Sequence, residues 1–326
     1  MRAILVRAPG GPEQLYLGEY PMPSPGPGEL LVRVRATSLN RADLLQREGK
    51  YPPPPGASPI LGLDVAGTVA ALGPGVTGWQ TGDRVFGLVE GGGYAEYAVL
   101  PAGMAMRIPD NLSFEEAAAI PEVFLTAYQA LCWLGQLQQN EHVLVHAGAS
   151  GVGTAAIQLA RCLGAHVHVT ASAPKHGVCR TLGAETTIDY RQEDFAERIQ
   201  EVTGGTGVHL IIDFVGAPYL EPNLRCLAMD GRIVLLATLG GSRVEAFNLR
   251  LLFARRAQLI ASTLRNRARD YKVRLTQEFA ERFLNDFAEG RLRPVIDRIY
   301  NWTEVADAHR RMESNQNVGK IVLRVL

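Results

Sequence analysis

Three glycines between an apolar run and a run of small residues are the residues with the clearest chemical meaning in this chain. Gly148, Gly151 and Gly153 lie in the segment HVLVHAGASGVGTAAIQLARCLGA, and Ser150 stands where the usual motif has its middle glycine. A strand that turns sharply into a helix beside a pyrophosphate needs glycines, and the helix N-terminus then offers N–H groups to that anion. The segment therefore predicts a dinucleotide-binding turn that includes Val152. A tight turn without a ligand is the structural alternative.

The residues after the following strand favour one nucleotide. Sites for NAD usually carry an Asp or Glu about 20 residues after the glycines, where it holds the ribose 2′-hydroxyl. Here the strand HVHVT is followed by ASAPK, which offers Ser172 and Lys175 and has no acid. A cation without a neighbouring carboxylate suits a 2′-phosphate, so we expect NADPH as the cofactor rather than NADH. The alternative is that Lys175 is only a solvated residue at a helix start.

The elements around the turn predict two kinds of domain. In the first ~120 residues, short apolar runs alternate with Gly/Pro clusters, which predicts an antiparallel, barrel-like β-domain. From Glu141 onward, apolar strands alternate with helical segments, which predicts an α/β domain with a doubly wound parallel sheet of the Rossmann type. The last segment alternates like the first, so we expect it to return to the first domain. The expected division is 1–120, 121–265 and 266–326.

Periodicity and punctuation also place individual elements. Ser113 followed by an acidic pair in SFEEAAAIP predicts a helix start. Further helices are expected from Gly151, up to about Leu182, over Asp270–Ala288 and over Glu304–Met312. The expected strands are Ala3–Arg7, Leu30–Ala36, Ala66–Leu72, Arg84–Leu88, Tyr94–Val99, His142–His146, His166–Thr170, Val208–Asp213, Arg232–Ala237, Gln258–Ser262, Val295–Ile299 and Lys320–Val325.

Composition narrows the classes of function. Lys plus Arg and Asp plus Glu are both 33, so bulk charge favours neither nucleic acid nor an anionic membrane as the main partner. Four separated cysteines without a C-x-x-C pair support no disulfide framework. The N-terminus is typical of a first strand rather than a signal peptide, and the apolar runs are too short to span a bilayer. We expect a cytoplasmic protein.

Six segments resemble a known family in their order and spacing. They are SLNRADLLQREGKYPPPPGAS, the run from Gly62 to Val85, AAAIPEVFLTAYQAL, VHAGASGVGTAAIQLAR, IIDFVG and NVGKIVL. Over essentially its whole length the chain resembles the zinc-free quinone oxidoreductase (zeta-crystallin-like) branch of the medium-chain dehydrogenase/reductase superfamily, and within it the p53-inducible type. The resemblance implies a GroES-like β-barrel domain and a Rossmann domain, with the cofactor in the cleft between them.

The same resemblance implies an oligomer and no metal. Relatives form homodimers or tetramers through sheet edges, for which Arg232–Leu239 and Gln258–Ser262 are the candidate strands. Zinc-dependent relatives use a cysteine, a His-Glu pair and a further Cys or His, and the matching slots here are filled by Asn40, Leu63 with Asp64, and Glu122. Asn, Leu and Glu cannot make the usual zinc site.

Without zinc, hydrogen-bond donors must stabilise the charge that develops on a substrate oxygen. The resemblance places Asn40, Tyr51, Arg265 and Ser150 at the catalytic pocket. The Tyr51 phenol would donate to a substrate oxygen, with a relay to solvent, and Arg265 would meet the oxyanion. The alternatives are that Tyr51 anchors its loop and that Arg265 is a solvated surface residue.

The family pattern adds cofactor contacts beyond the glycine turn. It implies that Thr126 lies near the nicotinamide, that Phe214, Val215 and Gly216 lie by the ribose, that Tyr190 lies at the 2′-phosphate end, and that Asn317 and Lys320 reach the cofactor from the C-terminal segment. The alternative for Lys320 is that it is only a charged residue at the edge of a strand. The histidines at positions 142, 146, 166 and 168 are interpreted as ordinary strand residues.

Three functions remain open from the sequence. A site with few donors suits an intrinsically electrophilic acceptor, so we expect an NADPH-dependent reductase that transfers hydride to an ortho-quinone. The first alternative is an NADPH-dependent reductase of activated alkenes such as enones or 2-alkenals. The second is a non-catalytic NADPH-binding protein with a structural or RNA-associated role.

Overall fold

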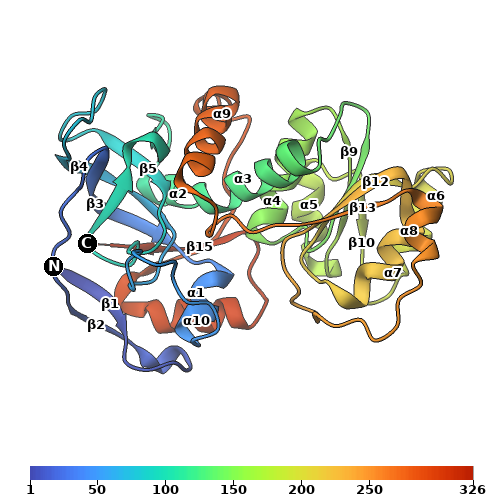
Figure 1. Ribbon diagram of the computed structural model, residues 1–326, viewed down its shortest axis with the longest axis horizontal. Helices are drawn as coiled ribbons and strands as arrows, with labels where there is room; N and C mark the ends of the chain where they lie inside the picture. The colour runs from blue at the N-terminus through green and yellow to red at the C-terminus, as the bar shows by residue number, and fades with distance from the viewer. Residues whose placement is uncertain (326) are drawn as a thin grey trace. The chain divides into compact units, whose positions relative to one another are not determined.

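The computed structural model describes residues 1–325 (Figure 1). The chain divides into two compact units. Unit 1 consists of Met1–Leu125 together with the C-terminal segment that begins at Arg265, and unit 2 is Thr126–Leu264.

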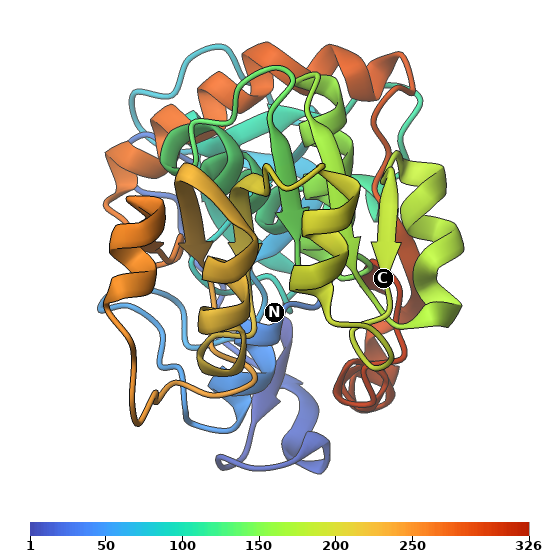
Figure 2. The ribbon, with the colours of Figure 1, turned by 90° about the vertical axis from the view of Figure 1, so that its right-hand side faces the viewer.

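Unit 2 is built on a six-stranded sheet within residues 126–264, in the order β10-β9-β8-β11-β12-β13. Neighbouring strands are parallel throughout, and they run side by side in Figure 2. Renumbered from β8, the order is 3-2-1-4-5-6, which is that of the Rossmann fold. The strands are β8 (His142–Val145), β9 (His166–Thr170), β10 (Thr186–Ile188), β11 (Val208–Asp213), β12 (Leu227–Leu235) and β13 (Gln258–Ala261).

Helices cover both faces of this sheet because its strands are apolar on both sides. In Figure 1, α4 and α5 lie on one side of the sheet and α6, α7 and α8 on the other. Residues Val143, Leu144 and Val145 of β8 are fully buried between them. The helices are α4 (Gly151–Cys162), α5 (His176–Leu182), α6 (Phe195–Val202), α7 (Ala217–Cys226) and α8 (Arg250–Arg255).

Unit 1 contains a seven-stranded sheet within residues 1–325, in which β14-β15-β3-β4-β5-β7 follow one another and β6 pairs with β3. The pairings are antiparallel except that of β14 with β15. A separate antiparallel pair is formed by β1 and β2. The strands are β1 (Arg2–Val6), β2 (Leu15–Glu19), β3 (Glu29–Ser38), β4 (Asp64–Leu72), β5 (Arg84–Leu88), β6 (Tyr97–Pro101), β7 (Ala105–Arg107), β14 (Ile296–Asn301) and β15 (Lys320–Arg324).

The C-terminal segment is part of unit 1. Val322 in β15 pairs with Ser38 in β3. The capping box at Ser113 is also confirmed, because Ser113 Oγ accepts from Glu116 N over 3.1 Å and the Glu116 carboxylate accepts from Ser113 N over 2.9 Å. The remaining helices are α1 (Arg41–Arg47), α2 (Phe114–Ala118), α3 (Pro121–Tyr128), α9 (Arg269–Ala288) and α10 (Val305–Glu313).

One strand begins later than the sequence indicated. The expected strand Tyr94–Val99 is β6, Tyr97–Pro101. Tyr94 lies outside it because its backbone N–H donates to Leu61 O over 2.9 Å and its carbonyl accepts from Ile4 N over 2.8 Å. These bonds to other loops and strands replace the pairing that β6 makes with β3.

Candidate active site

The glycine turn of unit 2 runs from β8 into α4. Ala147 has φ 49°, and Gly148 N donates to Thr170 O over 2.9 Å. Ser150 is the N-cap of α4, where its Oγ accepts from Gly153 N over 3.0 Å. Ser150, which the sequence assigned to the catalytic set, is thus a capping residue.

Glycine is required at two positions of this turn. A Cβ at Gly148 would lie 2.6 Å from the Cβ of Val169, and a Cβ at Gly153 would lie 2.4 Å from the carbonyl oxygen of Ala147. The turn is therefore as tight as the sequence predicted. The first turn of α4, with Gly151 and Val152, directs backbone N–H groups outward, as an anion site needs.

The three predicted 2′-phosphate residues follow neighbouring strands. Ser172 and Lys175 come after β9 and Tyr190 comes after β10, and the two strands are parallel. The strand ends are tied by a bond from Ala171 N to Ile188 O of 3.0 Å. Because both segments leave the same edge of the sheet, the structure brings these residues to one edge of unit 2, where Tyr190 is 43% exposed.

The loop after β11 holds the next predicted set, Phe214, Val215 and Gly216. Asp213 Oδ1 accepts from Val215 N over 2.6 Å and from Gly216 N over 3.1 Å. Thr126 is buried in α3. Asn317 lies in unit 1, where its Nδ2 donates to Gly319 O over 3.0 Å.

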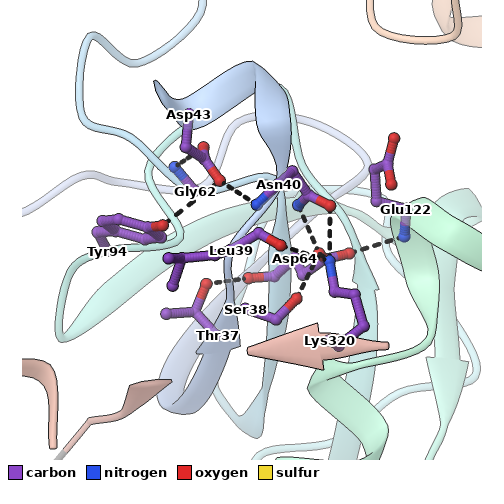
Figure 3. Close-up of polar contacts among 10 residues, drawn as sticks. All are labelled: Thr37, Ser38, Leu39, Asn40, Asp43, Gly62, Asp64, Tyr94, Glu122 and Lys320. Atoms are coloured by element: carbon purple, nitrogen blue, oxygen red, sulfur yellow. Dashed lines mark hydrogen bonds and ion pairs between the residues drawn. The ribbon is translucent and has the colours of Figure 1, made fainter. Parts of the chain in front are cut away.

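In unit 1, Asn40 and Asp64, from two of the zinc slots, meet around a lysine (Figure 3). The Lys320 ammonium, at the start of β15, donates to Leu39 O over 2.9 Å, to Asn40 Oδ1 over 2.6 Å and to Asp64 Oδ2 over 3.1 Å. These three bonds use all three donors of an ammonium group. Lys320 is only 3% exposed. A bond to a cofactor would require one of them to break.

The Asp64 carboxylate in this cluster is equally saturated. Its Oδ2 also accepts from Ser38 Oγ over 2.6 Å and from Asn40 Nδ2 over 2.8 Å, and its Oδ1 accepts from Glu122 N over 2.7 Å (Figure 3). With Lys320 this makes four donors for about four lone-pair sites. Asn40, expected as a catalytic residue, has both polar atoms of its amide in this cluster. We call Ser38, Asn40, Asp64 and Lys320 the saturated cluster.

Asp43 extends the buried polar groups toward α1. Its carboxylate accepts from Asn40 N over 2.7 Å and from Gly62 N over 2.9 Å, and the Tyr94 hydroxyl lies 3.4 Å away (Figure 3). The first bond caps α1 at its N-terminus. Burial nevertheless raises the pKa of Asp43 to about 6.

Arg265 is a buried cation of a different kind. Its Nε and Nη2 donate to Glu90 O over 3.0 and 2.7 Å. Its Nη1 is buried and has no hydrogen-bond partner among the residues that the structure describes. The guanidinium carbon lies 5.5 Å from the centre of the Tyr51 ring. Arg265 is therefore not the solvated surface residue that the sequence left open, since it is 7% exposed.

Two residues that support Arg265 were missed in the sequence. Lys272 in α9 donates to Arg265 O over 3.1 Å and forms an ion pair with the Glu90 carboxylate. Lys272 is 2% exposed, and it stands on the apolar stripe of α9 that continues with Leu275, Phe279, Phe283 and Phe287. The position of this lysine within an apolar helical stripe was the sequence signal that could have identified it as buried. We call Arg265, Glu90 and Lys272 the open cluster.

The protonation states of Tyr51 and Arg265 suit hydrogen-bond donation. Burial raises the pKa of the Tyr51 phenol, an effect that the charge of Arg265 partly offsets. Burial also lowers the pKa of Arg265 from its high ordinary value. At neutral pH the phenol is protonated and the guanidinium charged, because both pKa values lie far above 7 in model compounds.

Comparisons with known proteins show the family. Two family models match, the Alcohol dehydrogenase GroES-like domain over residues 26–110 and the Zinc-binding dehydrogenase over residues 182–323. The synaptic vesicle membrane protein VAT-1 homolog of Homo sapiens is 34% identical over 339 residues, which cover 99% of this chain and 86% of that protein. The chain belongs to the medium-chain dehydrogenase/reductase superfamily. The fold expected from the sequence, a GroES-like domain and a Rossmann-type domain, is confirmed.

Solved structures of this superfamily resemble the chain along its whole length. A mycobacterial protein complexed with NADPH has a TM-score of 0.88 and 32% identity and covers 100% of both chains. A quinone oxidoreductase of Pseudomonas syringae has a TM-score of 0.87 and 32% identity and covers 99% of both. An NAD-dependent alcohol dehydrogenase (TM-score 0.88, 35% identity) and the CurK enoyl reductase (TM-score 0.88, 29% identity) are also similar. This medium-chain dehydrogenase/reductase is therefore an oxidoreductase.

Residues 1–325 contain neither a metal-ligand cluster nor a helix that could span a membrane. No three His, Cys, Asp or Glu side chains in that range are arranged to hold a metal ion. No helix there has the length and apolar character that crossing a bilayer requires. Zinc independence stays a prediction for this medium-chain dehydrogenase/reductase.

Proposed function

We propose that the chain is an NADPH-dependent, zinc-independent quinone reductase of the zeta-crystallin-like branch, with ortho-quinones as acceptors. The observation that carries the proposal is the buried, unpartnered Nη1 of Arg265 beside the Tyr51 ring. Two donors without a metal ligand set polarise a carbonyl only modestly. A quinone needs little polarisation, because its reduction produces an aromatic ring.

The residues of unit 2 fit the cofactor. Gly148 and Gly153 allow the tight turn into α4, and the backbone N–H groups at the N-terminus of that helix would hold the pyrophosphate. Ser172, Lys175 and Tyr190 would hold the 2′-phosphate. Thr126 and the loop 214–216 would lie by the nicotinamide ribose. When bound, NADPH supplies a hydride from its C4 carbon.

Residues of unit 1 would act on the acceptor. Arg265 Nη1 donates to the substrate oxygen on which negative charge develops, where a preorganised donor contributes most. The Tyr51 phenol donates a proton to a substrate oxygen and regains one from solvent. Asn40 and Lys320 act indirectly, by fixing α1 and the start of β15, because the saturated cluster uses their polar atoms.

A cofactor and acceptor panel tests this function. Stopped-flow oxidation of NADPH by an ortho-quinone is expected to be fast in metal-depleted protein, with slower oxidation of NADH and no turnover of simple alcohols or aldehydes. Lys175→Ala is expected to reduce the preference for NADPH. Equal activity on a secondary alcohol, or activity that depends on added zinc, would overturn the proposal.

The second candidate is a reductase of activated alkenes, favoured by the likeness to an enoyl reductase structure. It would use the same cofactor and the same donors. Comparing kcat/KM for an ortho-quinone and an enone separates the two. Tight NADPH binding without oxidation by any electrophile would instead indicate the non-catalytic role.

We also propose a homodimer through the sheet edge of unit 2. The edge strand β13 exposes 47% of Leu259, and Leu249 and Phe253 nearby are 62% and 81% exposed. An exposed apolar edge strand is a template for pairing with a second copy. Sedimentation is expected to show a dimer that Leu259→Lys dissociates, and a monomeric wild type would contradict this.

A further inference from the structure

A row of buried polar side chains joins three strand ends of unit 2. His146, directly after β8, has Nδ1 2.9 Å from Thr170 Oγ1 and Nε2 2.8 Å from Asn223 Oδ1. Asn223 Nδ2 donates in turn to Asp213 Oδ2 over 2.9 Å. His146 and Asn223 are fully buried, and Thr170 and Asp213 are at most 2% exposed. Water therefore cannot substitute for these bonds, so each polar atom depends on its neighbour in the row.

The Asp213 carboxylate gives the row a direction. An ionised carboxylate only accepts, so it draws the Nδ2 group of Asn223 toward itself and turns Oδ1 toward His146. An amide oxygen also only accepts, so the imidazole must carry its proton on Nε2. Nδ1 then accepts from the Thr170 hydroxyl. Burial lowers the pKa of His146, which favours the neutral ring.

The other oxygen of Asp213 holds the loop that follows β11. Oδ1 accepts from the backbone N–H groups of Val215 and Gly216. Gly216 has φ 88°, and a Cβ there would lie 2.7 Å from the carbonyl oxygen of Gly241. The loop is therefore held in one conformation by a single carboxylate and by close packing.

We propose that Asp213, Asn223 and His146 form one positioning unit, in which the charge of Asp213 selects the Nε2–H tautomer of His146 and fixes the loop 214–216 for NADPH. None of the three is a catalytic residue, since they act through the loop. The tautomer is independent of the cofactor, whereas the effect on NADPH rests on the proposed function.

Asp213→Asn keeps the shape of the row but should reverse the direction of its hydrogen bonds. The new Nδ2 would donate to Asn223 Oδ1, the Asn223 amide would turn its Nδ2 toward His146, and the imidazole would move its proton to Nδ1. Long-range ¹H–¹⁵N correlation spectra of the full chain with ¹⁵N-labelled histidine report the tautomer. His146→Gln identifies the signal by removing it. We expect Nε2–H in the wild type and Nδ1–H in Asp213→Asn.

Binding of NADPH, followed by its fluorescence, is the second readout. Because a neutral amide oxygen accepts more weakly than a carboxylate, Asp213→Asn should bind NADPH about tenfold more weakly. The control is Asp194→Asn in the same unit. Asp194 also accepts two backbone N–H groups, at the cap of α6, and its replacement should change neither the tautomer nor the affinity.

The outcomes separate this inference from the proposed function. A wild-type spectrum with His146 protonated on Nδ1, or on both nitrogens, would overturn the inference, and this result does not depend on how any variant folds. An unchanged His146 tautomer in folded Asp213→Asn would also overturn it. A switched tautomer with unchanged NADPH affinity would overturn the positioning role. A wild type with the Nε2–H tautomer that binds no NADPH would leave the row intact and refute the proposed function.

Discussion

The saturated cluster and the open cluster of unit 1 both bury a cation, yet they treat its hydrogen bonds differently. Lys320 has an acceptor for each of its three donors, and Asp64 has four donors around its carboxylate. Arg265 is almost as buried, but its Nη1 has no acceptor in the described chain. The ammonium group of Lys320 therefore has no free donor for a ligand, whereas the guanidinium group of Arg265 has one.

In the proposed function, this difference separates a buried charge that holds the structure from one that acts on the substrate. Leaving a buried donor unsatisfied costs about 1–3 kcal/mol of stability. A protein can tolerate this loss of stability at a position where a bound ligand supplies the missing hydrogen-bond acceptor. A closed set of bonds gains nothing from a ligand and positions its neighbours, here α1, the start of α3 and β15.

The largest effect is expected from opening the saturated cluster. Lys320→Met leaves the Asp64 carboxylate buried without its counter-ion, which should lower the free energy of unfolding by about 3–5 kcal/mol in urea titrations. The double variant Lys320→Met/Asp64→Leu, which removes both charges, should recover most of this loss. A stable Lys320→Met that binds NADPH poorly would instead support the cofactor role that the sequence predicted.

A pH effect of intermediate size is expected from Asp43. Burial raises its pKa in the folded chain to about 6, from an ordinary value of 3.8. The folded state therefore binds more protons between these values, so the stability that Asp43 contributes is present below about pH 4 and is lost as the pH rises through 6. The loss is about 3 kcal/mol. Urea midpoints from pH 4 to 7 should show this slope in the wild type and not in Asp43→Asn. Equal slopes would contradict the assignment.

The smallest effect is expected at the support of the open cluster. Lys272→Met removes the bond to Arg265 O and the ion pair with Glu90, so the guanidinium should be less well oriented. We expect kcat for the quinone to fall about tenfold, as for one charged hydrogen bond, with an unchanged Kd for NADPH. Lys50→Met, which removes the exposed ion pair with Glu48, is the matched control. Similar kinetics for the two variants would show that Lys272 does not position Arg265.

Local sequence signals predicted much of the fold. The glycine turn, the apolar parallel strands and the capping box at Ser113 each depend on residues close together in the chain. Other helices were not predicted. Helix α7 contains Pro218 in its first turn and Pro222 in its interior, and α1 has only seven residues after Asn40, which the family resemblance treated as a metal slot.

The candidate site was predicted less completely, because its bonds cross long stretches of chain. Lys320 meets Asp64 across 256 positions and Lys272 meets Glu90 across 182. The apolar stripe of α9 marks Lys272 as buried but does not name its partner, and no local pattern distinguishes Lys320 from a cofactor ligand or a surface charge. The sequence named Arg265 and Tyr51 together, and their side chains lie side by side. Which donor of Arg265 is unpartnered depends on Glu90 O, a backbone atom.

The central claim is that Arg265 donates its unpartnered Nη1 to the oxygen of the acceptor. Single-turnover stopped-flow oxidation of bound NADPH by an ortho-quinone tests it most directly, with wild type and Arg265→Met at saturating cofactor. We predict a rate about 10²–10³-fold lower in the variant, with the same Kd for NADPH and the same far-UV spectrum. An unchanged rate in a folded variant that still binds NADPH would contradict the claim.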